Sequence, residues 1–211
     1  MTNQPMDGSD WDKRYSTADL VWSIEPNVFV AELTADLPVG TALDLAAGEG
    51  RNGLWLADRG WDVTAVDFSA AGLARAEQLA QARLGADVAR FVTICQDVTD
   101  YQPTPGSFDL VVVAYLQVPA ATRTVAMRTA GAALREGGTL VVIAHDSTNL
   151  DRGFGGPQDA DVLYTAGDTV GDLEGLGLVI DRAEAVERRV ETATGPQTAI
   201  DALVVTRRAL R

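Results

Sequence analysis

Three glycines within residues 44–53 have the spacing of a loop that holds a nucleotide or nucleoside. Gly48, Gly50 and Gly53 fit the pattern G-x-G-x-x-G between an apolar run and a helical pattern. Glycine suits such a loop because the chain must turn sharply and a ligand must approach the backbone. A tight strand-to-helix turn that binds nothing would give the same pattern, so the glycines alone do not establish a site.

Two acidic residues further along the chain could bind the rest of a nucleoside. Asp67 closes the second apolar run, where a carboxylate can accept hydrogen bonds from two ribose hydroxyls. Asp97 and Val98 follow the third run, where a carboxylate beside a backbone amide can bind the edge of adenine. The simpler explanations are an N-cap for Asp67 and a polar loop for residues 96–98. All three sites follow successive strands, where open α/β sheets bind ligands, so together they indicate a bound nucleoside.

The elements that must position these residues alternate between strands and helices. Five short, β-branched apolar runs are typical of parallel strands covered on both faces, and they span residues 41–46, 62–67, 90–95, 108–114 and 139–144. Helices are predicted over residues 52–59, 69–84, with Ser69 as the N-cap, and 119–134. This alternation predicts a parallel sheet with right-handed crossovers.

The C-terminal part of the chain departs from that alternation. Residues 178–191 and 198–207 both have strand character and flank a turn signal at residues 194–197. We therefore expect an α/β fold with a doubly wound, seven-stranded, mostly parallel sheet that ends in an antiparallel β-hairpin. Residues 39–211 would form the main domain, and residues 1–38 an N-terminal extension that caps the ligand.

Charge and composition limit the possible partners. The formal net charge is −13, a field that repels a phosphate backbone or an anionic membrane unless a basic patch overrides it. The basic residues offer only short arginine pairs, so we expect no nucleic acid and no membrane as partner. The apolar runs are shorter than the ~18 residues that a membrane helix needs. No signal-peptide pattern is present at the start, and we expect a cytoplasmic protein.

The scarcity of cysteine and histidine excludes other kinds of site. The chain has one cysteine, so no intrachain disulfide can form, and Cys95 in an apolar run is expected in the core. One histidine leaves no metal site of ordinary histidine ligand count, and we expect no metal.

The charges beside the glycine loop distinguish between nucleoside cofactors. A dinucleotide places a pyrophosphate at the helix N-terminus, which requires positive potential. Here Glu49 lies inside the loop and Asp44 shortly before it, and both would oppose a pyrophosphate. S-adenosylmethionine has no phosphate and carries an ammonium and a sulfonium, so acidic groups suit it. The sequence therefore favours S-adenosylmethionine over NAD.

Five segments resemble the class I S-adenosylmethionine-dependent methyltransferases. They are residues 43–52 (LDLAAGEGRN), 65–69 (AVDFS), 96–98 (QDV), 108–111 (FDLV) and 134–140 (LREGGTL). The chain is most similar to a small bacterial branch that includes the tellurite-resistance methyltransferases, through Trp11, Asp12, Arg14 and Tyr15 and through residues 48–52. Ala47 departs from the family where a cysteine often stands. The resemblance covers roughly residues 11–208.

The resemblance implies S-adenosylmethionine as cofactor, S-adenosylhomocysteine as its product, and a role for each motif. Gly48 and the neighbouring backbone would approach the methionine part, with Asp44 holding the loop or the ammonium. Asp67 would bind the ribose, Phe68 would lie against adenine, and Ala114 would face the methyl-bearing sulfur. Trp22 and Tyr15 could close over the cofactor or simply pack the extension. The cofactor-binding residues expected are Trp22, Asp44, Ala46, Gly48, Arg51, Asn52, Asp67, Phe68, Asp97, Val98 and Ala114.

The methyl acceptor is the least determined part of the site. His145 follows the fifth strand beside Asp146, and histidine exchanges a proton readily near neutral pH, so His145 is the candidate catalytic base. A hydrogen-bonded loop histidine is the alternative. Residues 149–157 could be a flexible lid or a surface loop. Arg188 and Arg189 could reach an acidic acceptor or form a solvated strand face.

No Asn/Asp-Pro-Pro-Tyr signature of amino-group methylation is present. We therefore expect a small-molecule acceptor, namely a thiol, a metalloid, a phenol or a carboxylate, and a protein that is a monomer or homodimer. Two other functions stay open, an NAD(P)-binding oxidoreductase and a non-catalytic S-adenosylmethionine-binding protein.

Overall fold

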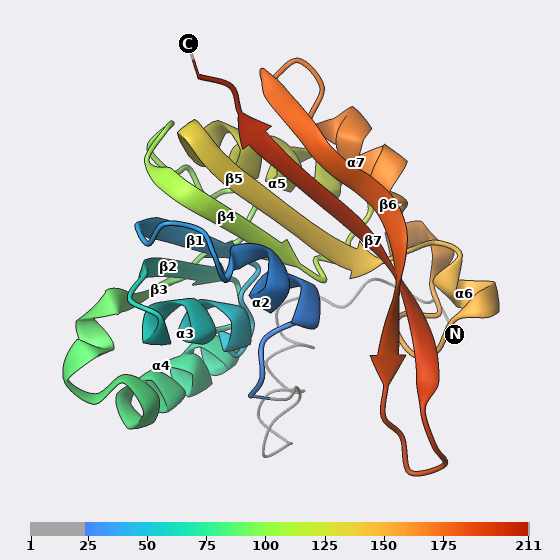
Figure 1. Cartoon of the computed structure of the whole chain (residues 1–211), viewed down its shortest axis with the longest axis horizontal. Helices are drawn as coiled ribbons and strands as arrows, with labels where there is room; N and C mark the ends of the chain where they lie inside the picture. The colour runs from blue at the N-terminus through green and yellow to red at the C-terminus, as the bar shows by residue number, and fades with distance from the viewer. Residues whose placement is uncertain (1–23, 211) are drawn as a thin grey trace.

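A computed structural model describes residues 24–210, and within them one sheet has the strand order β3-β2-β1-β4-β5-β7-β6 (Figure 1). Its seven strands are β1 (Thr41–Leu45), β2 (Asp62–Asp67), β3 (Phe91–Cys95), β4 (Phe108–Ala114), β5 (Leu134–His145), β6 (Leu178–Val190) and β7 (Gln197–Arg208). Strands β1 to β5 pair in parallel, and β7 runs antiparallel to both β5 and β6. This arrangement confirms the expected fold class.

Helices cover both faces of the sheet (Figure 1). They are α2 (Val28–Thr34), α3 (Arg51–Asp58), α4 (Ala70–Leu84), α5 (Ala120–Ala133), α6 (Asn149–Arg152) and α7 (Ala166–Asp172), with short 3₁₀ turns η1 (Gly85–Arg90) and η2 (Ala160–Val162). Helices α2, α3 and α4 lie on one face, and α5 and α7 lie on the other. No helix among residues 24–210 has both the length and the apolar character needed to cross a membrane.

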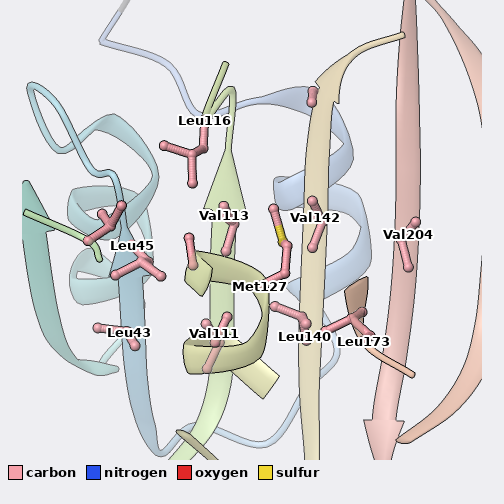
Figure 2. Packing of buried hydrophobic residues seen from close by; sticks show 14 of the residues in the cluster. Leu43, Leu45, Val111, Val113, Leu116, Met127, Leu140, Val142, Leu173 and Val204 are labelled. Carbon is pink, nitrogen blue, oxygen red and sulfur yellow. The ribbon is translucent and has the colours of Figure 1, made fainter. Parts of the chain in front are cut away.

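Alternate strand residues supply the two halves of the core, as the two-residue period of a strand requires. On the α5 side, Leu43, Val111 and Val142 pack against Met127 of α5 (Figure 2). On the other side, residues from the intervening positions pack with α2, α3 and α4, including Val30 of α2. Because α2 shares this core, residues 24–38 are packed into the sheet domain. The expected boundary at residue 38 stays a prediction, since residues 1–23 lie outside the described part.

The order in which successive strands are added to the sheet reverses between β1 and β4. Such a switch point is where open α/β sheets bind ligands. From β1 the chain proceeds outward to β2 and β3, and it then returns to place β4 on the opposite side of β1. The loops that leave the carboxyl ends of β1 and β4 therefore diverge to opposite faces at this point.

Two local features differ from the sequence predictions. Strand β5 begins at Leu134, earlier than expected, because Leu134 pairs with Phe108 across a register shift. Gly138 is required there, since a Cβ would lie 2.9 Å from the Phe108 carbonyl oxygen. Helix α7 was not predicted, although Thr165 and Asp168 form a capping box at its start.

Candidate functional site

The loop from β1 to α3 makes the sharp turn that the glycine pattern predicts. Ala46, Gly48 and Gly50 all have positive φ, at 64°, 57° and 76°. A positive φ costs alanine about 1–3 kcal/mol, and such strain often lies at ligand sites. At Gly50 and Gly53, packing leaves little room for any side chain. A Cβ on Gly50 would lie 2.9 Å from Ala76 Cβ, and one on Gly53 would lie 3.0 Å from Asp44 Oδ2.

Asp44, in β1, lies buried beneath this loop. Its side chain is 1% exposed, and Oδ2 accepts a hydrogen bond from the Gly53 amide at 2.8 Å. Oδ1 is buried and has no hydrogen-bond partner among the described residues. Burial raises the pKa of Asp44 to about 7, with a further increase from the charge of Asp67, while the Gly53 amide and Arg51 work against the rise. A nearby cation would therefore find a carboxylate whose charge is poorly compensated.

Asp67 joins the glycine loop to the start of α4. Its Oδ2 accepts from the Gly48 amide and its Oδ1 from the Ser69 amide, both at 2.8 Å. These two contacts fix the Asp67 carboxylate at the carboxyl end of β2, beside the loop. Ser69, with its Oγ 3.1 Å from the Gly72 amide, is the N-cap of α4, as predicted. The other acid of the loop, Glu49, forms an ion pair with Arg75 at 2.9 Å.

The residues expected around adenine differ in exposure. Phe68 is half-buried, Asp97 is exposed, and the Val98 side chain is buried in the core, so the Val98 backbone amide is the group available to a ligand. Asp97 Oδ1 accepts from the amide and hydroxyl of Thr99. The expectation that Cys95 lies in the core is wrong, because β3 is an edge strand and the Cys95 side chain is exposed.

At the end of β4, Ala114 is half-buried and the next residue, Tyr115, has a φ of 59°. A bulky aromatic residue in this region is an outlier that the surrounding structure must hold in place. The Tyr115 amide donates to the Ile143 carbonyl at 2.7 Å. Its hydroxyl donates to Asp201 Oδ2 and accepts from Asn27 Nδ2, each at 2.9 Å. Burial, followed by the charge of Asp201, raises the pKa of Tyr115, so the phenol stays protonated.

Asp201 of β7 connects Tyr115 to two basic side chains. It is fully buried, Arg188 Nε donates to its Oδ2 at 2.6 Å, and His145 Nδ1 lies 3.3 Å from its Oδ1. Burial favours a higher pKa, but the nearby His145 and Arg188 side chains outweigh it and keep the pKa of Asp201 below its ordinary value. Asp201 is therefore an anion that orients Tyr115, Arg188 and His145.

Two guanidinium groups and an imidazole lie against the Tyr115 ring. The guanidinium carbons of Arg51 and Arg188 each lie 5.6 Å from the ring centroid, and the His145 ring lies 4.9 Å from it. Arg189, which the sequence paired with Arg188, is instead 71% exposed and bonded to Glu191. We call Arg51, Tyr115, His145, Arg188 and Asp201 the Tyr115 cluster.

The structure also places Asn52 and residues 149–157, which the sequence singled out. Asn52 accepts a hydrogen bond from the Asn27 amide at 2.9 Å, so it holds the start of α2. Residues 149–157 include α6 and are tied down by Asn149, whose Nδ2 donates to the Gly155 carbonyl at 2.8 Å. Gly156 packs on His145, because a Cβ there would lie 2.8 Å from the imidazole ring. Trp22 and Tyr15 lie outside the described residues.

The sequence did not single out Tyr115, Asp201 or Asn27. Tyr115 could have been found, because it directly follows Ala114, the residue expected beside the methyl group. Asp201 gave a weaker signal, an acid within the otherwise apolar run of residues 199–205. Asn27 gave none. Among residues 24–210, no group of three or more acidic, histidine or cysteine side chains could hold a metal ion.

The chain is similar in sequence to known methyltransferases. Residues 42–138 match a family model described as a methyltransferase domain. Over 110 residues the chain is 34% identical to the tRNA 5-carboxymethoxyuridine methyltransferase of Escherichia coli K12, a match that covers 51% of this chain and 41% of that protein. The chain thus matches less than half the length of this curated relative.

Solved structures share the fold. TehB from Haemophilus influenzae superposes with a TM-score of 0.69 at 16% identity, covering 95% of this chain and 66% of that chain. Magnesium protoporphyrin IX methyltransferase from Synechocystis, solved with bound S-adenosylhomocysteine, superposes with a TM-score of 0.67 at 19% identity, covering 96% and 94%.

One sequence expectation is overturned by these comparisons. The net charge of −13 led us to expect no nucleic acid as partner, yet the curated relative is named for a substrate in tRNA. Net charge is a sum over the whole chain and does not describe a local field. The Tyr115 cluster brings Arg51 and Arg188 together at one place despite the acidic total.

Proposed function

We propose that this chain is a class I S-adenosylmethionine-dependent methyltransferase, which holds that cofactor at the β1–α3 loop and transfers its methyl group to an acceptor at the ends of β4 and β5. The observation that carries the proposal is Asp44, a buried carboxylate whose Oδ1 has no partner among the described residues. An ammonium beside it would supply the missing charge and hydrogen bond. A pyrophosphate there would face the negative charges of Asp44 and Asp67 instead.

The remaining cofactor contacts follow from the same arrangement. Asp67 would accept the ribose hydroxyls, while Phe68, Asp97 and the Val98 amide would bind adenine. Ala46, Gly48, Arg51 and Asn52 would shape the loop around the methionine part, and Ala114 would leave room for the sulfur. When bound, S-adenosylmethionine supplies a methyl group activated by a sulfonium. The protein's contribution is alignment, which is worth about 7–11 kcal/mol in well-oriented reactions.

The acceptor is proposed to be a small nucleophilic group, for which the sequence suggests a thiol, a metalloid, a phenol or a carboxylate on a small molecule. The name of the curated relative adds a second type of carrier, a modified uridine in tRNA, and its carboxymethoxy group contains a carboxylate. Of the classes that the sequence suggests, the carboxylate is therefore the one that the relative also supports. The cytoplasmic location stays a prediction.

Cofactor binding tests the first half of this proposal. Titration calorimetry should give a micromolar dissociation constant for S-adenosylmethionine, about 8 kcal/mol of binding free energy, and no heat with NAD⁺. Asp67→Ala should weaken binding by roughly 10- to 100-fold, because charge-assisted hydrogen bonds contribute about 1.5–3 kcal/mol each.

Asp67→Asn, which preserves the shape of the side chain, distinguishes lost ribose contacts from a disordered loop. Asp62→Ala is the matched control, since Asp62 begins the same strand and its side chain is 66% exposed. Tight NAD⁺ binding without S-adenosylmethionine heat would favour an oxidoreductase. A folded Asp67→Ala protein with unchanged affinity would move the nucleoside to another site.

A further inference from the structure

The Tyr115 cluster lies directly after Ala114, at the end of β4 where we propose that the acceptor binds. Arg51 comes from the start of α3, Arg188 from β6 and His145 from β5, so three separate elements direct basic groups to one phenol ring. The charge of Arg51 is felt by both Asp44 and Tyr115. Arg51 is the first residue of α3, directly after the β1–α3 loop, and its guanidinium carbon is 5.6 Å from the Tyr115 ring at the end of β4, so it connects the two places.

The acidic member of the cluster is not accessible to a ligand. The Asp201 side chain is 0% exposed while that of Arg188 is 22% exposed, so an incoming group meets the guanidinium and not the carboxylate. Asp201 also engages Tyr115, Arg188 and His145 at once. It orients these groups but is poorly placed to remove a proton from an acceptor.

The Arg188 guanidinium can serve two partners. Asp201 contacts its Nε at 2.6 Å and its Nη2 at 3.5 Å, and a guanidinium carries further N–H donors beyond those two positions. The bond to Asp201 fixes the plane of the guanidinium, which reduces the entropy lost when a second anion binds. Tyr115 stays a protonated phenol and cannot act as the base.

We infer that the methyl acceptor is a carboxylate, bound by Arg51 and Arg188 beside the Tyr115 ring; this inference rests on the proposed function. A guanidinium matches the two oxygens of a carboxylate with parallel hydrogen bonds, a geometry that a thiolate cannot provide. One carboxylate oxygen forms a bond to the methyl carbon, the methyl carbon–sulfur bond breaks, and its electron pair stays on sulfur. The products are a methyl ester and a neutral thioether, and no proton is released.

Matched pairs of small molecules test this assignment. We would incubate the full chain with methyl-labelled S-adenosylmethionine and a panel of aryl and alkyl carboxylates that includes phenoxyacetate, each beside its carboxamide. Label should enter carboxylates and not the carboxamides. The product is diagnostic, since alkali releases labelled methanol from a methyl ester but not from an ether or thioether.

Variants of the two arginines connect the chemistry to the cluster. At saturating S-adenosylmethionine, Arg51→Gln and Arg188→Gln should each lower kcat/KM for the carboxylate by roughly 10- to 100-fold, the strength of a charge-assisted hydrogen bond. Arg188→Lys should fold well and retain part of the activity, because it keeps the charge beside buried Asp201 and loses only the paired hydrogen bonds. Arg189→Gln is the matched control, from the next position on β6, and should behave as wild type.

Binding measured without turnover separates this inference from the proposed function. Phenoxyacetate titrated into the complex with S-adenosylhomocysteine should bind wild type and Arg189→Gln, and bind both glutamine variants more weakly. Label found only in ethers or thioethers, or no ester from any carboxylate, would overturn the carboxylate assignment. So would equal ester formation by wild type, Arg51→Gln and Arg188→Gln. If the same preparations still bind S-adenosylmethionine, only the carboxylate assignment is refuted. If wild type does not bind S-adenosylmethionine, the proposed function itself is refuted.

Discussion

Replacing His145 with alanine should lower kcat by roughly 10²–10⁴-fold for any acceptor that must lose a proton, such as a phenol or a neutral thiol. His145 lies at the end of β5 with Nδ1 3.3 Å from the buried Asp201 carboxylate. That contact orients the ring and leaves Nε2 as the nitrogen that can take a proton. The proposal that His145 is the catalytic base thus gains an orienting partner that the sequence did not reveal.

The same substitution should change the methylation of a carboxylate much less, because a carboxylate has no proton to lose. We would compare His145→Ala and His145→Gln on a phenol and on phenoxyacetate, with cofactor affinity measured for each variant. Thermal unfolding is needed as a control, since His145 packs on Tyr115 and Gly156. Equal rates for wild type and both variants on the phenol would exclude His145 as the base.

Asp44→Asn should stabilise the cofactor-free protein above pH 7 and weaken cofactor binding. Burial raises the pKa of Asp44 from 3.8 to about 7, so the folded state favours the neutral acid. The free energy of unfolding therefore falls as pH rises from about 4 to 7. At 1.36 kcal/mol per unit of pKa shift, the fall is at most about 4 kcal/mol. Asparagine avoids this loss but buries an amide without a partner, at a cost of about 1–3 kcal/mol. A net gain of about 1–3 kcal/mol is expected at pH 8.

Denaturant unfolding between pH 5 and 9 measures this effect, and Asp62→Asn provides an exposed control. The wild-type free energy of unfolding should fall toward pH 7 while that of Asp44→Asn stays nearly level. Affinity for S-adenosylmethionine should show the opposite trend. It should rise in wild type as Asp44 ionises, and it should be lower and independent of this ionisation in the variant. Parallel pH profiles for the two proteins would contradict the role of Asp44 as partner of the ammonium.

The sequence predicted the sheet well because its strands are encoded locally. The five parallel strands are apolar on both faces, and β2 and β4 have the bounds that their apolar runs predict. The hairpin and the Ser69 cap also follow from local signals. The bulge that lets β5 begin at Leu134 was missed because it depends on pairing with Phe108, which no local pattern encodes.

The Tyr115 cluster could not be predicted for a related reason. Its members come from α3, β5, β6, β7 and the end of β4, and only the folded sheet brings them together. Arg188 and Arg189 illustrate this limit, since they are adjacent in sequence and one faces Asp201 while the other lies in solvent. Strand alternation predicts that neighbours face opposite ways but not which one faces the site. Asp44 and Asp67 were easier, because each lies at or near the carboxyl end of a parallel strand, where open α/β sheets bind ligands.

Methyl transfer from labelled S-adenosylmethionine tests the central claim most directly. Wild-type protein would be incubated with a thiol, a phenol and a carboxylate in turn, and both the labelled product and S-adenosylhomocysteine would be measured. We predict that the two form in equal amounts with at least one acceptor, and that Asp67→Ala abolishes most of both at low cofactor concentration. A protein that binds S-adenosylmethionine tightly yet forms neither product with any acceptor would be a cofactor-binding protein without catalysis, and would contradict the account.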